Sequence, residues 1–219
     1  MTTRRRATPG TSLIATAILI GLGIEILTGA WTDGVKLAEL GAIVKYYIVE
    51  EHEYWRLLSA MFLHGNGTIP GTALHLAVNL IALLQLGKLY ELMFGTRRFL
   101  SVYFITGIAA SITSMVHNAG PSVGASGAIF GLMGAFIFSV RRSPRWRHER
   151  AARGIVQQVV FWTLANVAIG FQFPQIDMAA HLGGLVAGVI LGVLLPHREP
   201  PPPPAQVVID VAPYEERGP

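Results

Sequence analysis

The segment Gly124-Ala125-Ser126-Gly127-Ala128-Ile129-Phe130-Gly131 places one serine among small residues, near the start of the apolar run Val123–Val140. At about 1.5 Å per residue, a helix of this length covers most of the ~30 Å hydrocarbon core of a bilayer. A serine in such a run either packs against another helix or takes part in chemistry. The segment by itself favours packing, so the interpretation depends on what the rest of the chain brings to the same depth.

The composition indicates a membrane protein. Of the 219 residues, 52% are hydrophobic and only 14% are charged, whereas soluble domains carry about 25% charged residues. The net charge of +4 does not indicate a nucleic-acid partner, because the basic residues form short clusters between apolar runs, as in cytoplasmic membrane loops. Cysteine is absent, which excludes disulfides and thiolate catalysis. We expect no cofactor.

Six apolar runs predict an all-α, polytopic membrane protein with six transmembrane helices. The runs are Ser12–Trp31, Thr72–Phe94, Phe99–Val116, Val123–Val140, Gly154–Phe171 and Met178–Leu195. This pattern divides the chain into a cytoplasmic segment (1–11), a membrane domain (12–196) and a proline-rich tail (197–219). The tail contains five consecutive prolines and is predicted to be polyproline II or disordered.

Residues 32–71 form the least regular part of the chain. The segment is too charged to span a membrane, with four charged residues between positions 50 and 56, and too apolar for a solvated loop. A first outer loop that is partly embedded in the membrane and contains short helices fits this composition. The breakers Gly65-Asn66-Gly67 and Pro70-Gly71 are predicted to end it.

The arginines and lysines predict the orientation of the chain. One side carries the basic clusters at 4–6, 97–98 and 141–153, and then Arg198, whereas the third and fifth loops, on the other side, carry no lysine or arginine. This bias predicts that both termini are cytoplasmic. We expect a multi-pass protein of a bacterial plasma membrane.

This topology brings polar residues from distant segments to one face. The second, fourth and sixth helices enter from the outer side, and His75, Ser126 and His181 each lie three or four residues after the predicted start of their helix, about 4–6 Å below the boundary. Asn79 lies one turn deeper than His75, on the same helix face. Polar groups at such depth usually face a cavity or one another.

Small residues predict close packing between the fourth and sixth helices. Residues 127, 131 and 135 on one helix, and 180, 184, 188 and 192 on the other, are all glycine or alanine at a spacing of four. Such ladders let two helix backbones approach closely in lipid. This packing would bring Ser126 within hydrogen-bond reach of His181.

These residue types suit nucleophilic catalysis. A serine hydroxyl needs a base to take its proton, and His181 is the candidate base for Ser126. A tetrahedral oxyanion needs hydrogen-bond donors, for which Asn79, His75 and the backbone N–H of Ser126 are available. Gly124 and Gly127 leave room for a substrate backbone beside the serine. No spacing of ligands indicates a metal site.

At this point the chain resembles the rhomboid family of intramembrane serine proteases. The matching stretches appear in family order across residues 50–195 and are Glu53-Tyr54-Trp55-Arg56 with Ser59 to His64, His75-x-x-x-Asn79, Gly124-Ala125-Ser126-Gly127 and Ala180-His181-Leu182-Gly183-Gly184. The resemblance implies a six-helix core and a Ser126–His181 dyad without a required acid. It also implies Asn79 and His75 at the oxyanion hole, and an active site open to the outer face.

The resemblance further implies that the substrates are single-pass membrane proteins, cut near the outer end of their transmembrane helix. Phe130 occupies the position where the family often has a tyrosine that packs on the base, and the segment from His64 to His75 is longer than in compact bacterial members. The sequence does not indicate the oligomeric state.

Alternatives remain for several residues. Asp177 could orient His181 as a third catalytic residue, or could lie at the mouth of the helix as a cap or a solvated charge. Glu25 in the first helix suggests a neutral or hydrogen-bonded packing role, and Trp55-Arg56 an anchor for the first loop. For the whole chain, the alternative to a protease is a catalytically inactive rhomboid-like protein that binds membrane clients. A small transporter is disfavoured, because the polar residues lie near one face rather than at the midplane.

Overall fold

The computed structural model describes residues 7–65, 67–117, 120–173 and 175–196. Within these ranges the chain is helical, and its only extended pairing is one bridge between Ile43 and Ser122, which confirms the all-α class. The proline-rich tail and part of the N-terminal segment lie outside the described residues. The helices are α1 (Pro9–Thr28), α2 (Gly34–Leu40), α3 (Lys45–Val49), α4 (Arg56–Ser59), the 3₁₀ turn η1 (Ala60–Phe62), α5 (Ile69–Ala82), the π-helical η2 (Leu83–Gly87), α6 (Lys88–Phe94), α7 (Thr96–His117), α8 (Ser126–Arg142), α9 (Arg150–Gly170) and α10 (Met178–Leu194).

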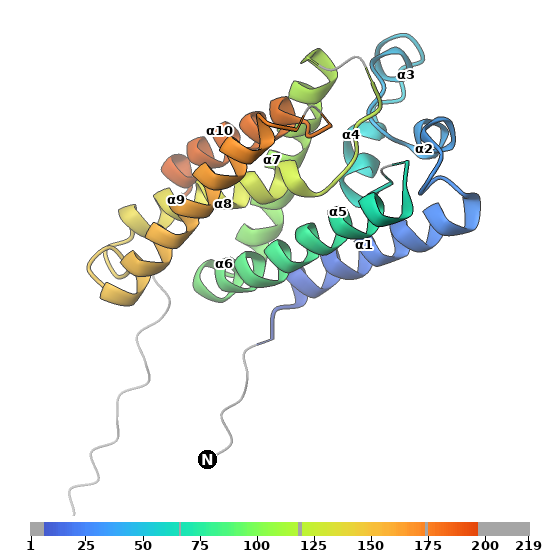
Figure 1. Cartoon of the computed structure of the whole chain (residues 1–219). Helices are drawn as coiled ribbons and strands as arrows, with labels where there is room; N and C mark the ends of the chain where they lie inside the picture. The colour runs from blue at the N-terminus through green and yellow to red at the C-terminus, as the bar shows by residue number, and fades with distance from the viewer. Residues whose placement is uncertain (1–6, 66, 118–119, 174, 197–219) are drawn as a thin grey trace, which may run out of the picture.

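Helix α8 forms the centre of the bundle, with α7 and α10 packed against it (Figure 1). Every residue of α8 from Gly127 to Ile137 is buried. In contrast, α1, α5 and α9 direct large apolar side chains outward, among them Leu19, Leu27, Leu74, Val78, Phe161 and Leu164. Exposed apolar surface of this extent marks an interaction with another apolar phase. The outward faces of these helices are therefore suited to lipid.

Among the residues that the structure describes, three helical runs are long and apolar enough to cross a membrane, namely Pro9–Thr28, the continuous run Ile69–Phe94 and Thr96–His117. Helix α10 is apolar but has only 17 residues, α8 is equally short, and α9 carries arginines in its first turn. All six predicted apolar runs form helices. That each of the six crosses the membrane stays a prediction.

Five of the six helices start three or four residues away from the start of their predicted run, and two of these differences affect the site. Helix α5 begins at Ile69, so Pro70-Gly71 lies in its first turn rather than ending the loop. Proline is tolerated there because the first N–H groups of a helix have no helical partner, and the hydroxyl of Thr68 accepts a hydrogen bond from the N–H of Gly71 at 3.1 Å. Helix α8 begins at Ser126 rather than Val123, because Ser122 pairs with Ile43 of the first loop and Gly124, at a φ of +129°, donates its N–H to the carbonyl of Ala60.

The common depth predicted for the polar residues changes accordingly. Ser126 is the first residue of α8, whereas His75 lies a turn and a half inside α5, and only His181 lies three residues after the start of its helix. The number of residues from the helix start therefore differs between the three, although Ser126 and His181 are in contact and the space beside Gly124 adjoins both His75 and Ser126. The three residues still lie at the same end of the bundle as the first loop.

The first loop contains short helices, as predicted. Arg56 organises it from inside, because its side chain is only 3% exposed and forms an ion pair with Glu53 at 2.5 Å. The guanidinium also donates to the carbonyl groups of Ala38 and Ala42. Arg56 therefore ties α2 and the following turn to α4, which confirms its structural role.

Two carboxylates hold the ends of α1. Glu91 of α6 accepts hydrogen bonds from the N–H groups of Gly10 and Thr11 at 2.8 Å, and from the hydroxyl of Thr11 at 2.7 Å. At the other end, Glu25 is fully buried and accepts from the N–H groups of His64 and Gly65 at 2.7 Å each. The hydrogen-bonded role predicted for Glu25 is confirmed, and it fixes the end of the first loop to α1.

Candidate active site

Ser126 and His181 meet where α8 and α10 begin. The Oγ atom of Ser126 lies 2.8 Å from Nε2 of His181, a hydrogen-bond distance. His181 is 9% exposed, and its other ring nitrogen, Nδ1, has no hydrogen-bond partner in the part of the chain that the structure describes. A neutral imidazole that carries its proton on Nδ1 accepts the serine proton at Nε2. The two residues therefore have the geometry of a nucleophile and its base.

Direct backbone contact between α8 and α10 sets this distance. A Cβ atom added to Gly184 would lie 2.0 Å from the carbonyl oxygen of Gly127, and one added to Gly188 would lie 2.0 Å from that of Gly131. Both distances are far below any possible contact, so no side chain fits at either glycine. The small-residue spacing predicted this approach. Its consequence is that one rigid pair of helices carries both Ser126 and His181.

Phe130 supports the ring of His181 from one side. The two rings are stacked, with centroids 4.3 Å apart and planes inclined by 13°. Phe130 lies one turn after Ser126 on α8, so the same helix carries the hydroxyl and the surface on which the imidazole rests. This contact limits the rotation of the ring without using a hydrogen bond.

His75 faces Ser126 from the side of α5. Its Nδ1 lies 3.3 Å from the carbonyl oxygen of His64. A carbonyl only accepts, so this contact assigns a proton to Nδ1 and leaves Nε2 of the neutral ring as an acceptor. A Cβ atom added to Gly124 would lie 2.8 Å from Nε2 of His75 and 3.8 Å from Oγ of Ser126. The space beside Gly124, whose φ is +129°, thus adjoins both groups.

Asn79 and His64 complete this side of the site. Asn79 is buried, and its amide donates to the carbonyl oxygen of His75 at 2.8 Å, which leaves a second N–H on the same nitrogen. His64 lies next to His75, with ring centroids 5.0 Å apart. Burial, and then the neighbouring His75, lower the pKa of His64 to about 3, so its ring is neutral near pH 7. His64 therefore contributes a carbonyl to the site and no charge.

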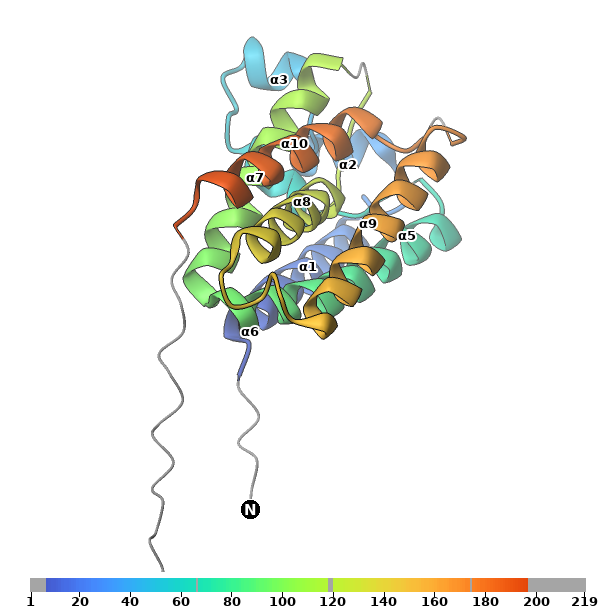
Figure 2. The ribbon, with the colours of Figure 1, turned by 90° about the vertical axis from the view of Figure 1, so that its left-hand side faces the viewer.

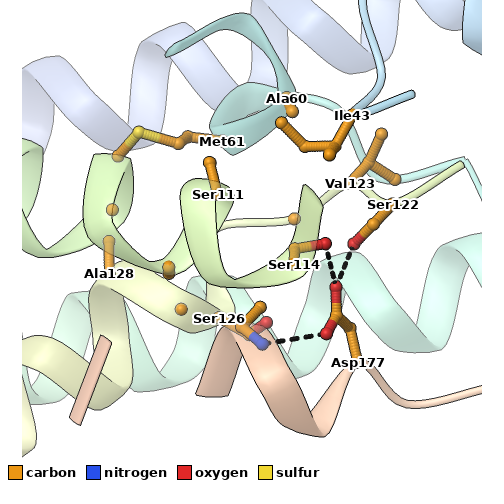
Figure 3. A pocket seen from close by; sticks show the side chains of 15 residues that line it. Ile43, Ala60, Met61, Ser111, Ser114, Ser122, Val123, Ser126, Ala128 and Asp177 are labelled. Atoms are coloured by element: carbon orange, nitrogen blue, oxygen red, sulfur yellow. Dashed lines mark hydrogen bonds between the residues drawn. The ribbon is translucent and has the colours of Figure 1, made fainter. Parts of the chain in front are cut away.

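Asp177 lies beside the site, and neither ring nitrogen of His181 is hydrogen-bonded to it. One carboxylate oxygen accepts from the N–H of Ala180 at 2.8 Å and so caps α10. The other accepts from the hydroxyls of Ser114 on α7, at 2.5 Å, and Ser122 before α8, at 2.6 Å (Figure 3). Of the two alternatives for Asp177, the structure thus supports the cap. Its carboxylate also joins three segments around the site.

The start of α8 is the feature that the sequence did not reveal. Because Ser126 is the first residue of the helix, the N–H groups of its first turn have no helical acceptor, and no side chain caps them. Such N–H groups favour an anion. The sequence offers little to locate this start, because Ala125 cannot cap a helix with its side chain and the apolar run already begins at Val123.

A small cavity of about 30 Å³ lies behind Ser126, between the first loop, α7 and α10 (Figure 3). Its apolar wall includes Ile43, Met61 and Val123, and Figure 3 shows Ser114, Ser122 and Asp177 at its polar end. A cavity of this size has room for water where polar partners line it. Among the described residues, no cluster of three or more histidine or acidic side chains could hold a metal ion.

The fold and site together describe an integral membrane protein in which a serine and a histidine from two helices meet near one end of the bundle. The model of the Rhomboid domain matches residues 51–198, and the chain belongs to this family.

Three relatives illustrate the similarity. The chain is 37% identical over 182 residues to the rhomboid protease GluP of Bacillus subtilis (strain 168), covering 83% of this chain and 34% of that protein. It is 37% identical over 163 residues to RHOMBOID-like protein 5 of Arabidopsis thaliana (73% and 49%). It is 34% identical over 161 residues to RHOMBOID-like protein 1 of the same plant (73% and 39%). The chain thus spans about a third to a half of the length of these relatives.

Proposed function

We propose that this chain is an intramembrane serine endopeptidase that cuts single-pass membrane proteins in or near their transmembrane helix. The observation that carries the proposal is the 2.8 Å contact between Ser126 Oγ and His181 Nε2, held by two helices in backbone contact. A relative that is named a rhomboid protease supports it. We further propose six membrane crossings, cytoplasmic termini and a site that opens to the outer face, on the basis of the arginine clusters.

In the proposed reaction, Oγ of Ser126 attacks the scissile carbonyl while Nε2 of His181 takes the serine proton. The tetrahedral oxyanion forms, the C–N bond breaks, and His181 returns the proton to the leaving amine. A water molecule, deprotonated by the same nitrogen, then hydrolyses the acyl-enzyme and restores the serine. His181 needs no acid partner in this scheme, in agreement with the unpaired Nδ1 among the described residues.

The donors for the oxyanion differ in kind. The N–H groups at the start of α8 and the second N–H of Asn79 donate whatever the protonation state of the site. His75 donates from Nε2 only as an imidazolium, because its contact with His64 keeps the first proton on Nδ1. We therefore assign the permanent oxyanion hole to Ser126 and Asn79, and to His75 a role that depends on its second proton.

A substrate helix must expose its backbone before attack, since its amide groups are bonded within the helix. We expect cleavage sites with small or helix-weakening residues, because the space beside Gly124 and Gly127 is narrow. Asp177 enters this proposal as a positioning residue: it fixes the start of α10 and the segment before Ser126 against α7.

The test uses the purified chain in liposomes with a transmembrane reporter substrate. We expect Ser126→Ala and His181→Ala each to abolish cleavage, and a fluorophosphonate probe to label the unchanged chain but not Ser126→Ala. Thermal unfolding of each variant controls for folding. Full cleavage by either variant would refute the dyad. Absence of both cleavage and labelling in the unchanged chain would favour a catalytically inactive protein that binds membrane clients.

A further inference from the structure

A second cavity lies far from Ser126, where α8 ends and α9 begins. It has a volume of about 230 Å³ and is lined by Arg141 at the end of α8, Arg147 in the connection, Arg153 and Gln157 on α9, and the valines at 140 and 156. Figure 2 shows the α8–α9 connection at the end of the bundle where α1 begins and α6 ends. This is the end opposite to the first loop.

The charges around this cavity are not balanced by the protein. Three arginines from three successive elements line one space, and in the described part of the chain the only ion pair is the one between Arg56 and Glu53. Like charges that line one cavity repel each other, and an anion between them would relieve that repulsion. Arginine presents planar paired donors that match phosphate oxygens. The lining therefore suits a phosphate group.

The rest of the cavity shows which kind of phosphate fits. Its floor is formed by Val140 and Val156, which are 1% and 5% exposed and would gain nothing from a free inorganic anion. One face of α9 continues from this cavity along the helix. Its residues, at spacings of four, four and three, are Arg153, Gln157, Phe161 and Leu164. Phe161 and Leu164 are 63% and 64% exposed. This face changes from basic to polar to apolar along the helix.

An anionic phospholipid has the same order of chemistry, with a charged phosphodiester, a polar glycerol region and apolar chains. We propose that the cavity binds the head group of an anionic phospholipid, with the phosphodiester between the three arginines and an acyl chain along Phe161 and Leu164. Basic cavities between membrane helices are a recurrent form of lipid recognition. The proposal requires that α9 contacts lipid, and it is independent of catalysis by Ser126.

A general attraction between basic loops and anionic membranes is the competing explanation, and the chain offers a matched control for it. Arg97, Arg142 and Arg150 are exposed at the same end of the bundle, but none of them lines the cavity. Changing these three to glutamine removes the same charge as changing the three arginines of the cavity. Diffuse attraction would weaken equally in both triple variants, whereas a built site would weaken in only one.

The experiment measures lipid adducts on the purified full chain by native mass spectrometry, with added phosphatidylglycerol or, for comparison, phosphatidylcholine. We expect the cavity variant (Arg141→Gln, Arg147→Gln and Arg153→Gln together) to retain phosphatidylglycerol at least about tenfold less, since each arginine near an anionic surface contributes about 1 kcal/mol. The control variant should retain it as the unchanged chain does, and phosphatidylcholine should bind weakly to all three.

Equal loss in both triple variants, or no loss in either, would overturn the proposal. Competition of inorganic phosphate with phosphatidylglycerol at equal concentration would show a free-anion site instead. If the triple cavity variant fails to fold, Arg147→Gln alone provides the test, because this residue is exposed in the connection. A loss of about threefold or more in that variant supports the site, and unchanged retention refutes it.

Discussion

Ser126 lies between two helices that the protein holds in different ways. On one side α10 touches α8 backbone to backbone, through Gly184 and Gly188, and brings in His181. On the other side α5 brings in His75 and Asn79 but packs much less extensively on α8, and much of its surface faces outward. The base is thus fixed by sterics, whereas the oxyanion side is fixed by single hydrogen bonds to His64 and within α5.

This difference teaches which part of the site tolerates movement. Where two helix backbones touch directly, no side chain can change rotamer to let them move. The nucleophile and the base therefore keep their relative positions. A helix with few contacts to the core can shift while its internal hydrogen bonds persist. Substitutions on the α10 side should therefore affect folding and activity together, and those on the α5 side should affect activity alone.

The largest effect is expected at the α8–α10 contact. Gly188→Val would place methyl groups on the carbonyl of Gly131, which belongs to a buried backbone and cannot move aside. We expect destabilisation of about 3 kcal/mol or more and loss of folded protein. Thermal unfolding in detergent measures it. Gly154→Val on α9 is the control, because nothing lies within 4 Å of an added Cβ there. Equal stability of the two variants would contradict the comparison.

The next effect concerns the space beside the serine. Gly124→Ala would place its methyl group 2.8 Å from Nε2 of His75, at a φ of +129° that alanine adopts only with strain. We expect kcat for a transmembrane substrate to fall about 10²-fold, because the methyl group fills the space beside Ser126 and misplaces the scissile carbonyl, with folded yield retained. Gly67→Ala has a positive φ but open space around it, and should keep full activity. A comparable loss in both variants would point to backbone strain alone.

A smaller effect separates positioning from catalysis at Asp177. We expect Asp177→Asn to lower kcat about tenfold with KM unchanged, because the bonds to Ser114 and Ser122 weaken and the dyad shifts slightly. A true third member of a triad would lose about 10⁴-fold on the same change. The rate of fluorophosphonate labelling of Ser126 gives an independent readout. Asp33→Asn, which alters the cap of α2, is the control.

The smallest effect is expected where Phe130 stacks on His181. Phe130→Leu removes the aromatic contact but keeps an apolar side chain, so we expect kcat to fall about two- to tenfold, in line with about 0.5–1.5 kcal/mol for a ring pair. Phe130→Tyr should stay within about twofold of the unchanged chain. Steady-state cleavage rates measure both, and a larger loss in the tyrosine variant would mean that the site has no room for a hydroxyl.

The pattern of apolar and small residues in the sequence was sufficient to predict part of this architecture. The six apolar runs form helices, and the glycine ladder predicted which two helices touch, because close approach in lipid needs small residues at a spacing of four. The predicted nucleophile and base lie at hydrogen-bond distance for the same reason. A buried acid such as Glu25 was expected to find hydrogen bonds, since no other arrangement is stable in an apolar environment.

Other features depend on contacts between distant segments and left no local signal. The start of α8 at Ser126 is set by the pairing of Ile43 with Ser122, which comes from the first loop. The tautomer of His75 is set by a carbonyl eleven residues away in sequence. Asp177 looked like a helix cap or a catalytic acid, and its link to two serines on other segments could not be read from its neighbours in the chain.

Glu25 has a consequence for the biosynthesis of this protein. Its partner His64 follows 39 residues later in the chain, so in the proposed topology α1 enters the membrane before the N–H groups that donate to its carboxylate have been made. A charged residue costs about 2.5–3.5 kcal/mol at the centre of an inserting helix, and less towards the ends, where Glu25 lies; leucine and isoleucine residues offset this cost. The long apolar run of α1 supplies these residues. The first helix is therefore apolar enough to be inserted alone, and its acid acquires hydrogen bonds only when the first loop arrives.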